Sequence, residues 1–226
     1  MKKILIITLL LIPAIILGQQ GVVIKNINFS SIDIKDKIKV QLIKSDESYI
    51  EVITKNNKPQ YIEYEIDNDT LILKKKKDAD ANEEIFVNVY YKNVYKIKAT
   101  KKAEISSKNI IKTDNLIVEL SWGAQALLDL DIKDFKVKLI EGSLCSVNGY
   151  ADNISAYLTT GSTFSAFTLE AKKCDIIANA NSKAKIYVTE ELKAEAASLG
   201  NILYKGNPMR KDVKVKVGGK IENLKE

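Results

Sequence analysis

The chain has no histidine, one arginine, one tryptophan, three prolines and two cysteines among its 226 residues. The lack of histidine excludes Ser-His-Asp and Cys-His catalytic triads, the most common general base and most types of zinc site. Glycine-rich loops that could cradle a phosphate are also missing, because the ten glycines are isolated or stand at expected turns. We therefore expect no catalytic residues, no metal and no other cofactor.

Carboxylates are plentiful, but they do not form a known ligand or catalytic pattern. The nearest approaches to a calcium site are Asp67-Asn68-Asp69 and Asp129-Leu130-Asp131. Neither has the glycine and the distal glutamate of an EF-hand loop. A glycosidase needs two converging carboxylates, whereas acids alternate with lysines along the predicted strands. An enzyme that cleaves polysaccharides, as a lyase or a hydrolase, is therefore the least favoured alternative.

The charge pattern does not indicate a nucleic-acid partner. The formal net charge is +6, which includes Lys2 and Lys3, and both signs are interspersed along the chain. The single basic cluster, Lys74–Lys77, is followed directly by acidic residues, as in a solvated turn. A nucleic-acid binder would show clustered basic residues with interleaved aromatic residues.

Residues 1–18 have the pattern of a secretory signal peptide. Lys2 and Lys3 precede an apolar run, Ile4–Leu17, which is shorter than the roughly 18–20 residues that span a bilayer. A retained membrane anchor is the alternative. We expect cleavage after Gly18, a mature chain that begins near Gln19 without a transmembrane anchor, and a location in the periplasm, on the outer cell surface or in the medium.

A repeat of about nineteen residues begins near residue 95 and continues toward the C-terminus. Each unit opens with a run of alternating apolar residues, and most runs are followed by a glycine, as in a strand with one buried face that ends in a tight turn. Stacked units of this length predict a β-solenoid. The expected inward column contains the residues that open each unit: Leu116, Phe135, Ile154, Cys174, Leu192 and Val213.

The repeat register also predicts side-chain ladders and the state of the cysteines. It places Glu119 beside Lys138, Asp175 beside Lys193 and Glu195 beside Lys216. Cys145 and Cys174 lie about one and a half coils apart, or ~7 Å along the axis at ~4.8 Å per coil, which is too far for a disulfide bond. We expect two buried free thiols.

Residues 19–92 are also rich in β-branched and alternating residues, but without a constant period. No linker rich in proline, glycine or serine separates them from the rest. The predicted fold is therefore all-β: a β-helix of single-strand coils over residues 93–226, continuous as one domain with an irregular β-rich N-terminal half.

The exposed aromatic residues offer a candidate binding strip. The register places Phe167 above Tyr187 and beside Asn148 on an outward face, and it places Tyr157 beside Ile177. Such rings stack on sugars or contact a protein partner; ordinary ladder packing on a solvated face is the alternative. The last coil, from Val213, has no polar cap, so we also expect edge-to-edge pairing with another copy of the chain.

The chain resembles a known family in the order of several weak motifs. These are Phe29-Ser30-Ser31-Ile32-Asp33-Ile34, the glycine-centred turns, the segment Asn201–Pro208 and the final Gly218-Gly219 turn. They are similar to the autotransporter-adhesin head family (head GIN domain, domain of unknown function 2807). The chain departs from that family's Gly-Ser-Gly turns, for example at Ala180-Asn181-Ser182, where Asn181 can replace glycine in the left-handed conformation.

The resemblance implies a β-helical fold without catalytic residues and an adhesion role at a Gram-negative type of envelope. Together with the residue patterns, it predicts an exported, non-catalytic β-solenoid that presents a binding surface to a glycan or a protein. A carbohydrate-recognition module of the envelope and a purely structural envelope protein are the alternatives.

Overall fold

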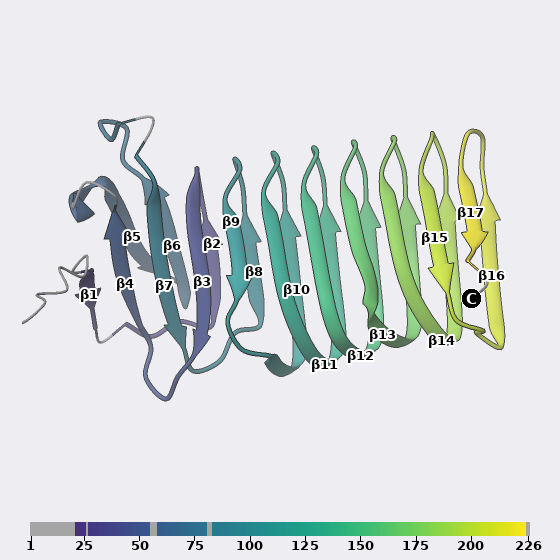
Figure 1. Ribbon diagram of the computed structural model, residues 1–226, viewed down its shortest axis with the longest axis horizontal. Helices are drawn as coiled ribbons and strands as arrows, with labels where there is room; N and C mark the ends of the chain where they lie inside the picture. Colours follow the sequence, from purple (N-terminus) through teal and green to yellow (C-terminus); the bar gives the residue numbers. More distant parts are fainter. Residues whose placement is uncertain (1–20, 26, 55–57, 81–82, 225–226) are drawn as a thin grey trace, which may run out of the picture.

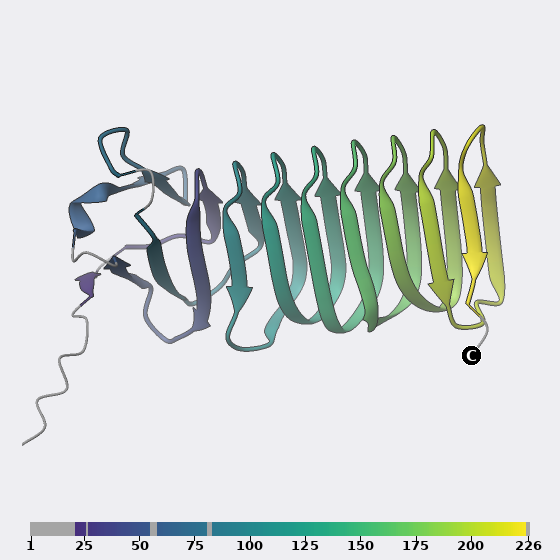
Figure 2. The ribbon, with the colours of Figure 1, turned by 45° about the horizontal axis from the view of Figure 1, so that its top comes forward.

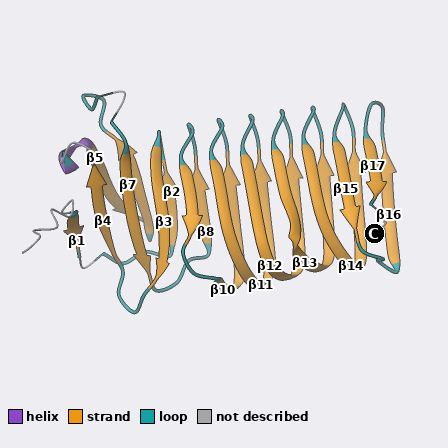
Figure 3. Ribbon diagram, in the orientation of Figure 1, coloured by secondary structure: helices purple, strands orange, loops and turns teal. Residues whose placement is uncertain are grey.

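A computed structural model describes residues 21–25, 27–54, 58–80 and 83–224. The expected signal peptide, residues 1–18, lies outside these residues. The described chain is an elongated stack of coils (Figures 1 and 2). It is almost entirely β-structure, as Figure 3 shows, with one short 3₁₀ turn at Pro59–Tyr61 among the described residues. Within these ranges, no helix is long and apolar enough to cross a membrane.

Two layers of strands run along the stack, which we call layer A and layer B. Layer A contains β1 (Val22–Ile24), β4 (Tyr49–Thr54), β7 (Ile85–Tyr91), β3 (Ile38–Lys44), β9 (Glu104–Ser107), β15 (Asn201–Lys205) and β17 (Lys220–Asn223). Layer B contains β5 (Ile62–Asp67), β6 (Thr70–Lys75), β2 (Ser31–Ile34), β8 (Lys96–Ala99) and β16 (Arg210–Val215).

The long strands link the two layers. β11 (Gln125–Leu139), β12 (Leu144–Leu158), β13 (Thr163–Ala178) and β14 (Lys183–Ala196) begin in layer A, bend and end in layer B, and the end of β10 (Ile111–Leu120) joins layer B. These strands pair in parallel with the coils on either side. The predicted β-solenoid is therefore confirmed.

The strand register confirms five of the six residues that were expected in one inward column. Leu116, Phe135, Ile154, Cys174 and Leu192 are aligned and buried. The expectation for Val213 is wrong. Lys211 lies beside Leu192 and keeps the nineteen-residue spacing, whereas Val213 lies beside Ala194 and is exposed. The alternation of valines in β16 had suggested a register displaced by two residues.

The predicted ladders of opposite charge hold in two places and change in one. Glu119 is aligned with Lys138, and Asp175 is aligned with Lys193. Glu195 is aligned with Lys214, but its carboxylate still pairs with the amino group of Lys216 at 2.6 Å. Exposed pairs of this kind add little stability, so they report the register more than they maintain the fold.

The tight turns between layer B and layer A use two successive left-handed residues. Examples are Glu141-Gly142 and Ala180-Asn181, with φ of 55°, 71°, 47° and 61°, so the expected role of Asn181 is confirmed. Gly200 has a different role from the one expected. Ser198 and Leu199 carry the positive φ of that turn, and Gly200 is required because a Cβ there would overlap the carbonyl oxygen of Ala178.

One hydrophobic core fills the space between the layers, from Ile27 to Tyr204. Inward residues alternate with outward ones along each strand, as the period-2 patterns predict. Cys145 and Cys174 belong to this core and are free thiols, which confirms the prediction. Burial raises the pKa of Cys145 to about 12 and raises the pKa of Cys174 as well, so both remain protonated at neutral pH.

The irregular N-terminal half has a structural cause. β2 and β3 pair in parallel with β8 and β9 and so belong to the stack. β4 and β5, in contrast, pair antiparallel with β7 and β6, and β1 pairs antiparallel with β4. Antiparallel strands need no constant repeat length, which explains why no period extends over this part of the sequence.

Candidate binding face

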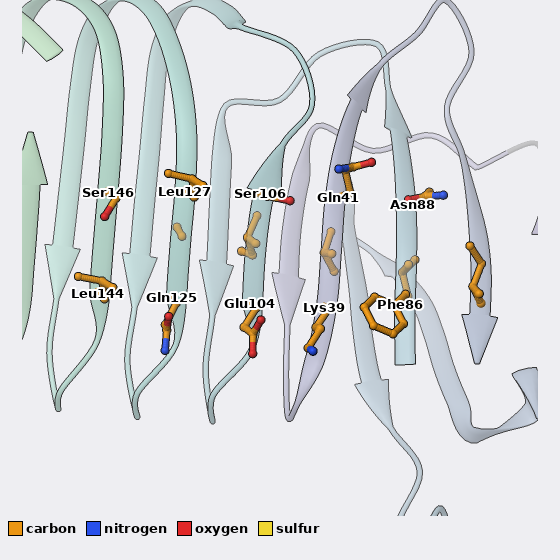
Figure 4. A pocket seen from close by; sticks show the side chains of 15 residues that line it. Lys39, Gln41, Phe86, Asn88, Glu104, Ser106, Gln125, Leu127, Leu144 and Ser146 are labelled. Carbon is orange, nitrogen blue, oxygen red and sulfur yellow. The ribbon is translucent and has the colours of Figure 1, made fainter. Parts of the chain in front are cut away.

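The outer face of layer A has a long open groove across β7, β3, β9, β11 and β12, with a volume of about 750 Å³. Its side chains form two rows that run along the stack (Figure 4). Row 1 consists of Phe86, Lys39, Glu104, Gln125 and Leu144, and row 2 consists of Asn88, Gln41, Ser106, Leu127 and Ser146.

The rows follow directly from strand alternation. In β3, Val40 and Leu42 point into the core, so Lys39 and Gln41 point outward. The same parity places Phe86 and Asn88 outward on β7, between the buried Ile85, Val87 and Val89. Because the strands are in register, outward residues two apart on each strand form two parallel rows.

Two apolar side chains of the groove are exposed to solvent. Phe86 has 40% of its surface exposed and Leu127 has 54%. Neutral hydrogen-bonding groups surround them, above all the amides of Asn88, Gln41 and Gln125 and the hydroxyls of Ser106 and Ser146. An exposed ring beside fixed amides is an arrangement that can bind a ligand with both apolar and hydroxyl surfaces.

Two side chains of the groove, Lys39 and Asn88, are held by acidic neighbours. The amino group of Lys39 pairs with Glu84 at 3.2 Å and lies 5.1 Å from the ring centre of Phe86. Asn88 donates a hydrogen bond of 2.8 Å to Glu51. These contacts hold the Phe86 ring and the Asn88 amide in place.

The predicted aromatic strip lies on the same layer, on β13 and β14, but not in the expected register. Asn148 is aligned with Thr168, and Tyr187 is aligned with Glu170. Phe167 therefore lies in a β-bulge, where the extra residues displace it from the column that was expected to place it above Tyr187. Spacing alone could not reveal this bulge.

Each predicted side chain of the strip has its own partner. The amino group of Lys185 lies 5.9 Å from the ring centre of Phe167, and that of Lys205 lies 4.5 Å from the ring centre of Tyr187. Asn148 donates to the carboxylate of Asp129 at 2.9 Å and accepts from Thr168. Each ring therefore contacts a lysine, not the other ring. The amide of Asn148 is hydrogen-bonded to the coils on both sides.

Tyr157 and Ile177 are brought together as predicted. They are aligned on β12 and β13, on the outer face of layer B, and Tyr157 is exposed. A shallow groove beside them contains Glu119, Lys138 and Asp175. Its charged lining differs from the neutral amides of the groove on layer A, and the two grooves lie on opposite layers.

The two calcium-like clusters of the sequence have other neighbours in the described part of the chain. Among the described residues, no group of three or more His, Cys, Asp or Glu side chains could hold a metal ion. Asp67 and Asp69, one of the calcium-like clusters, lie at the turn between β5 and β6. In the other cluster, Asp129 accepts from Asn148 and Asp131 pairs with Lys112 at 3.0 Å.

The groove on layer A is the feature that the sequence did not reveal. Its first strands, β7 and β3, pair in parallel although residues 45–84, which include β4, β5 and β6, separate them in the chain. The local signals were the alternations in Ile38–Leu42 and Ile85–Tyr91, which mark Lys39 and Phe86 as outward. Their neighbours could not be assigned without the tertiary register.

Comparison with known proteins gives a consistent result. The family model described as "Putative auto-transporter adhesin, head GIN domain" (DUF2807) matches residues 28–208. A putative adhesin from Bacteroides fragilis superposes with a TM-score of 0.83 at 19% identity, over 90% of this chain and 96% of that one. A search of curated proteins found no match.

Two further solved structures share the fold. A protein from Parabacteroides distasonis, described as a putative lipid binding protein, has a TM-score of 0.71 at 17% identity, over 91% of this chain and 96% of that one. A putative adhesin from Parabacteroides merdae has a TM-score of 0.65 at 23% identity, with the same coverage. At these identities the likeness concerns the fold.

Proposed function

Because the chain belongs to the family of auto-transporter adhesins with a head GIN domain, we propose that it is an exported, non-catalytic adhesin that binds a surface glycan through the groove on layer A. The observation that carries this proposal is the pair of rows in that groove (Figure 4). Adhesion itself is suggested by the family, and the ligand class is suggested by the side chains.

The two rows fit a glycan in both shape and chemistry. An open groove of about 750 Å³ is large enough for several sugar units of an extended chain. The exposed face of Phe86 can stack on the apolar side of a sugar ring. The amides of Gln41, Asn88 and Gln125 can exchange hydrogen bonds with its hydroxyls, as donors and as acceptors.

The aromatic residues that the sequence singled out lie on β13 and β14, the strands of layer A that follow the end of the groove at β12. Phe167 and Tyr187, with Asn148 between them and the groove, extend the contact surface for a longer ligand. Lysines above both rings favour a ligand with acidic groups at this end. Tyr157 and Ile177, on layer B, form a separate candidate contact for a protein partner.

A glycan array, probed with the full chain and two paired variants, tests the proposal. Phe86→Ser with Leu127→Ser should reduce glycan binding at least tenfold, because the two most exposed apolar side chains of the groove are lost. Phe167→Ser with Tyr187→Ser should reduce binding only to longer glycans. Tyr157→Ser with Ile177→Ser, on the opposite layer, is the matched control and should bind like the unmodified chain.

Two results would overturn the proposal. Binding to phosphatidylcholine vesicles that is lost in the Phe86 and Leu127 variant, without glycan binding, would instead assign the groove to a lipid, the class of ligand for which the neighbour from Parabacteroides distasonis is named. Release of reducing ends from a polysaccharide, abolished by one carboxylate substitution, would show an enzyme.

A further inference from the structure

Among the residues that the structure describes, the two outermost strands of layer B each have a neighbour on one side only. At the N-terminal end of the stack, β5 pairs with β6. At the C-terminal end, β16 pairs with β14. Figure 1 shows these strands at opposite ends of the molecule. The backbone groups on their outer edges are therefore free to pair with another strand.

Both edge strands have exposed apolar side chains on the face that is turned toward the hydrophobic core. In β5, Tyr64 and Ile66 are aligned with the buried Leu73 and Leu71, yet they are 46% and 40% exposed. In β16, Val213 and Val215 are aligned with the buried Ala194 and Ala196, yet they are 41% and 55% exposed. Each pair is exposed because the core that would cover it stops at the edge of the stack.

The outward side chains of the two strands have opposite charges. β5 presents Glu63, Glu65 and Asp67. β16 and the residue that follows it present Arg210, Asp212, Lys214 and Lys216. A contact between two copies of β5 would bring only acids together and is disfavoured. A contact between two copies of β16 can place Asp212 opposite Lys214, but the same register places Arg210 opposite Lys216. A contact between β16 and β5 can instead pair two lysines with two glutamates, so it is the favoured combination.

We propose that the β16 edge of one copy of the chain pairs antiparallel with the β5 edge of the next copy, head to tail. The direction follows from the topology. All pairings of layer B from β6 to β16 are parallel, and only β5 runs the opposite way. A second copy displaced along the stack therefore places its β5 antiparallel to β16.

The side-chain parity then selects a register. Cross-strand neighbours point to the same face, so Tyr64 lies opposite Val215 and Ile66 opposite Val213. The same register places Glu63 opposite Lys216 and Glu65 opposite Lys214. Asp67 lies opposite Asp212, an unfavourable pair at the end of the paired stretch. Two apolar and two oppositely charged pairs thus outnumber one pair of like charge.

The charges select the partner more than they supply affinity. Glu63 already pairs with Lys74 at 2.7 Å, and Lys216 pairs with Glu195 at 2.6 Å, each within its own copy. The main gain comes from the burial of the four apolar side chains and from the new backbone hydrogen bonds. Because the contact joins two different surfaces, it does not close on itself and generates a filament. This inference does not depend on what the groove on layer A binds.

The test uses two charge-reversal variants of the full chain, in sedimentation equilibrium at low ionic strength and in electron microscopy. Lys214→Glu with Lys216→Glu reverses one edge, and Glu63→Lys with Glu65→Lys reverses the other. Each variant alone should self-associate at least tenfold more weakly than the unmodified chain. An equimolar mixture should regain association, because the acidic β16 of one variant then meets the basic β5 of the other.

Lys136→Glu with Lys138→Glu is the matched control. It makes the same change of charge at exposed positions in the middle of layer B, so it should associate like the unmodified chain. Circular dichroism and the melting temperature show that each variant is folded. A monomer at every concentration, an N-terminal variant that associates normally, or a mixture that stays monomeric would each overturn the proposal.

Discussion

The two ends of the stack differ in how far the hydrophobic core is covered there. At the N-terminal end, the antiparallel strands β4 and β5 cover part of the core: Ile50 and Ile62 are buried there, whereas Tyr64 and Ile66 of β5 remain exposed. At the C-terminal end, β16 simply continues the parallel coils, and the valines that occupy core positions are exposed. Each added parallel coil buries the inward side chains of the previous coil but leaves its own strand edge unpaired. Covering the core at the end of a stack therefore requires strands that depart from the repeat.

This contrast explains where regularity and irregularity occur in the chain. The coils from β10 to β14 repeat because each one packs on an equivalent neighbour. The region of β1 to β7 does not repeat because its strands have different neighbours on their two sides. The N-terminal end, where β4 and β5 cover part of the core, is therefore irregular. The C-terminal end, which we call the open end, retains the repeat.

The largest expected effect compares an inward residue of each end. Ile50→Ala removes a fully buried side chain from the N-terminal end and should lower the free energy of unfolding by about 4 kcal/mol. Val213→Ala removes two methyl groups that are already partly in water and should cost less than about 1 kcal/mol. Urea titration monitored by circular dichroism measures both. Equal losses would mean that the C-terminal end is covered in solution.

An intermediate effect compares a regular turn with the turn between β14 and β15. Gly200→Ala places a Cβ against the carbonyl oxygen of Ala178 and should cost about 3 kcal/mol, because backbone must move. Gly142→Ala meets no atom within 4 Å, so only its φ of +71° is strained, and the cost should be about 1 kcal/mol. Thermal unfolding of the two variants checks the difference. A larger loss for Gly142→Ala would contradict the close approach.

The smallest effect concerns local opening, which the two cysteines report. Both thiols are buried, and burial raises the pKa of Cys145 to about 12, so a thiol reagent at pH 8 reacts only after local opening. Cys174 lies nearer to the open end than Cys145. The single-thiol variant that keeps Cys174 should therefore react several-fold faster than the one that keeps Cys145. Reaction of either thiol at the rate of the unfolded chain would show that the core is not closed.

The repeat could be predicted because its determinants are local and recur. The alternation from Leu116 to Leu192 predicted the inward column, and the same register predicted the ladders of charge and the unpaired cysteines. The prediction failed at Val213, where three alternating valines resembled a core strand although their place at the edge leaves them exposed. Alternation shows which side chains share a face, but it does not show that the face is covered.

The candidate site was harder to predict. Phe167 and Tyr187 were expected in one column because their spacing is twenty residues, but a β-bulge in β13 separates them. The groove on layer A was missed because Phe86 and Lys39 are neighbours only through the parallel pairing of β7 with β3. A periodic pattern does not show how many extra residues a β-bulge contains. It also does not show that β3 pairs with β7 across residues 45–84, which separate them in the chain.

The sequence by itself determined the fold class, the inward faces of the coils, the turn positions and the absence of histidine chemistry, because each depends on residue types at short range. Only the tertiary structure decided which strands of the N-terminal region lie side by side, how they cover one end and which outward side chains form the two rows of the groove. These depend on pairing between segments far apart in the chain, where many registers satisfy the same alternation and only the packing of the whole stack selects one.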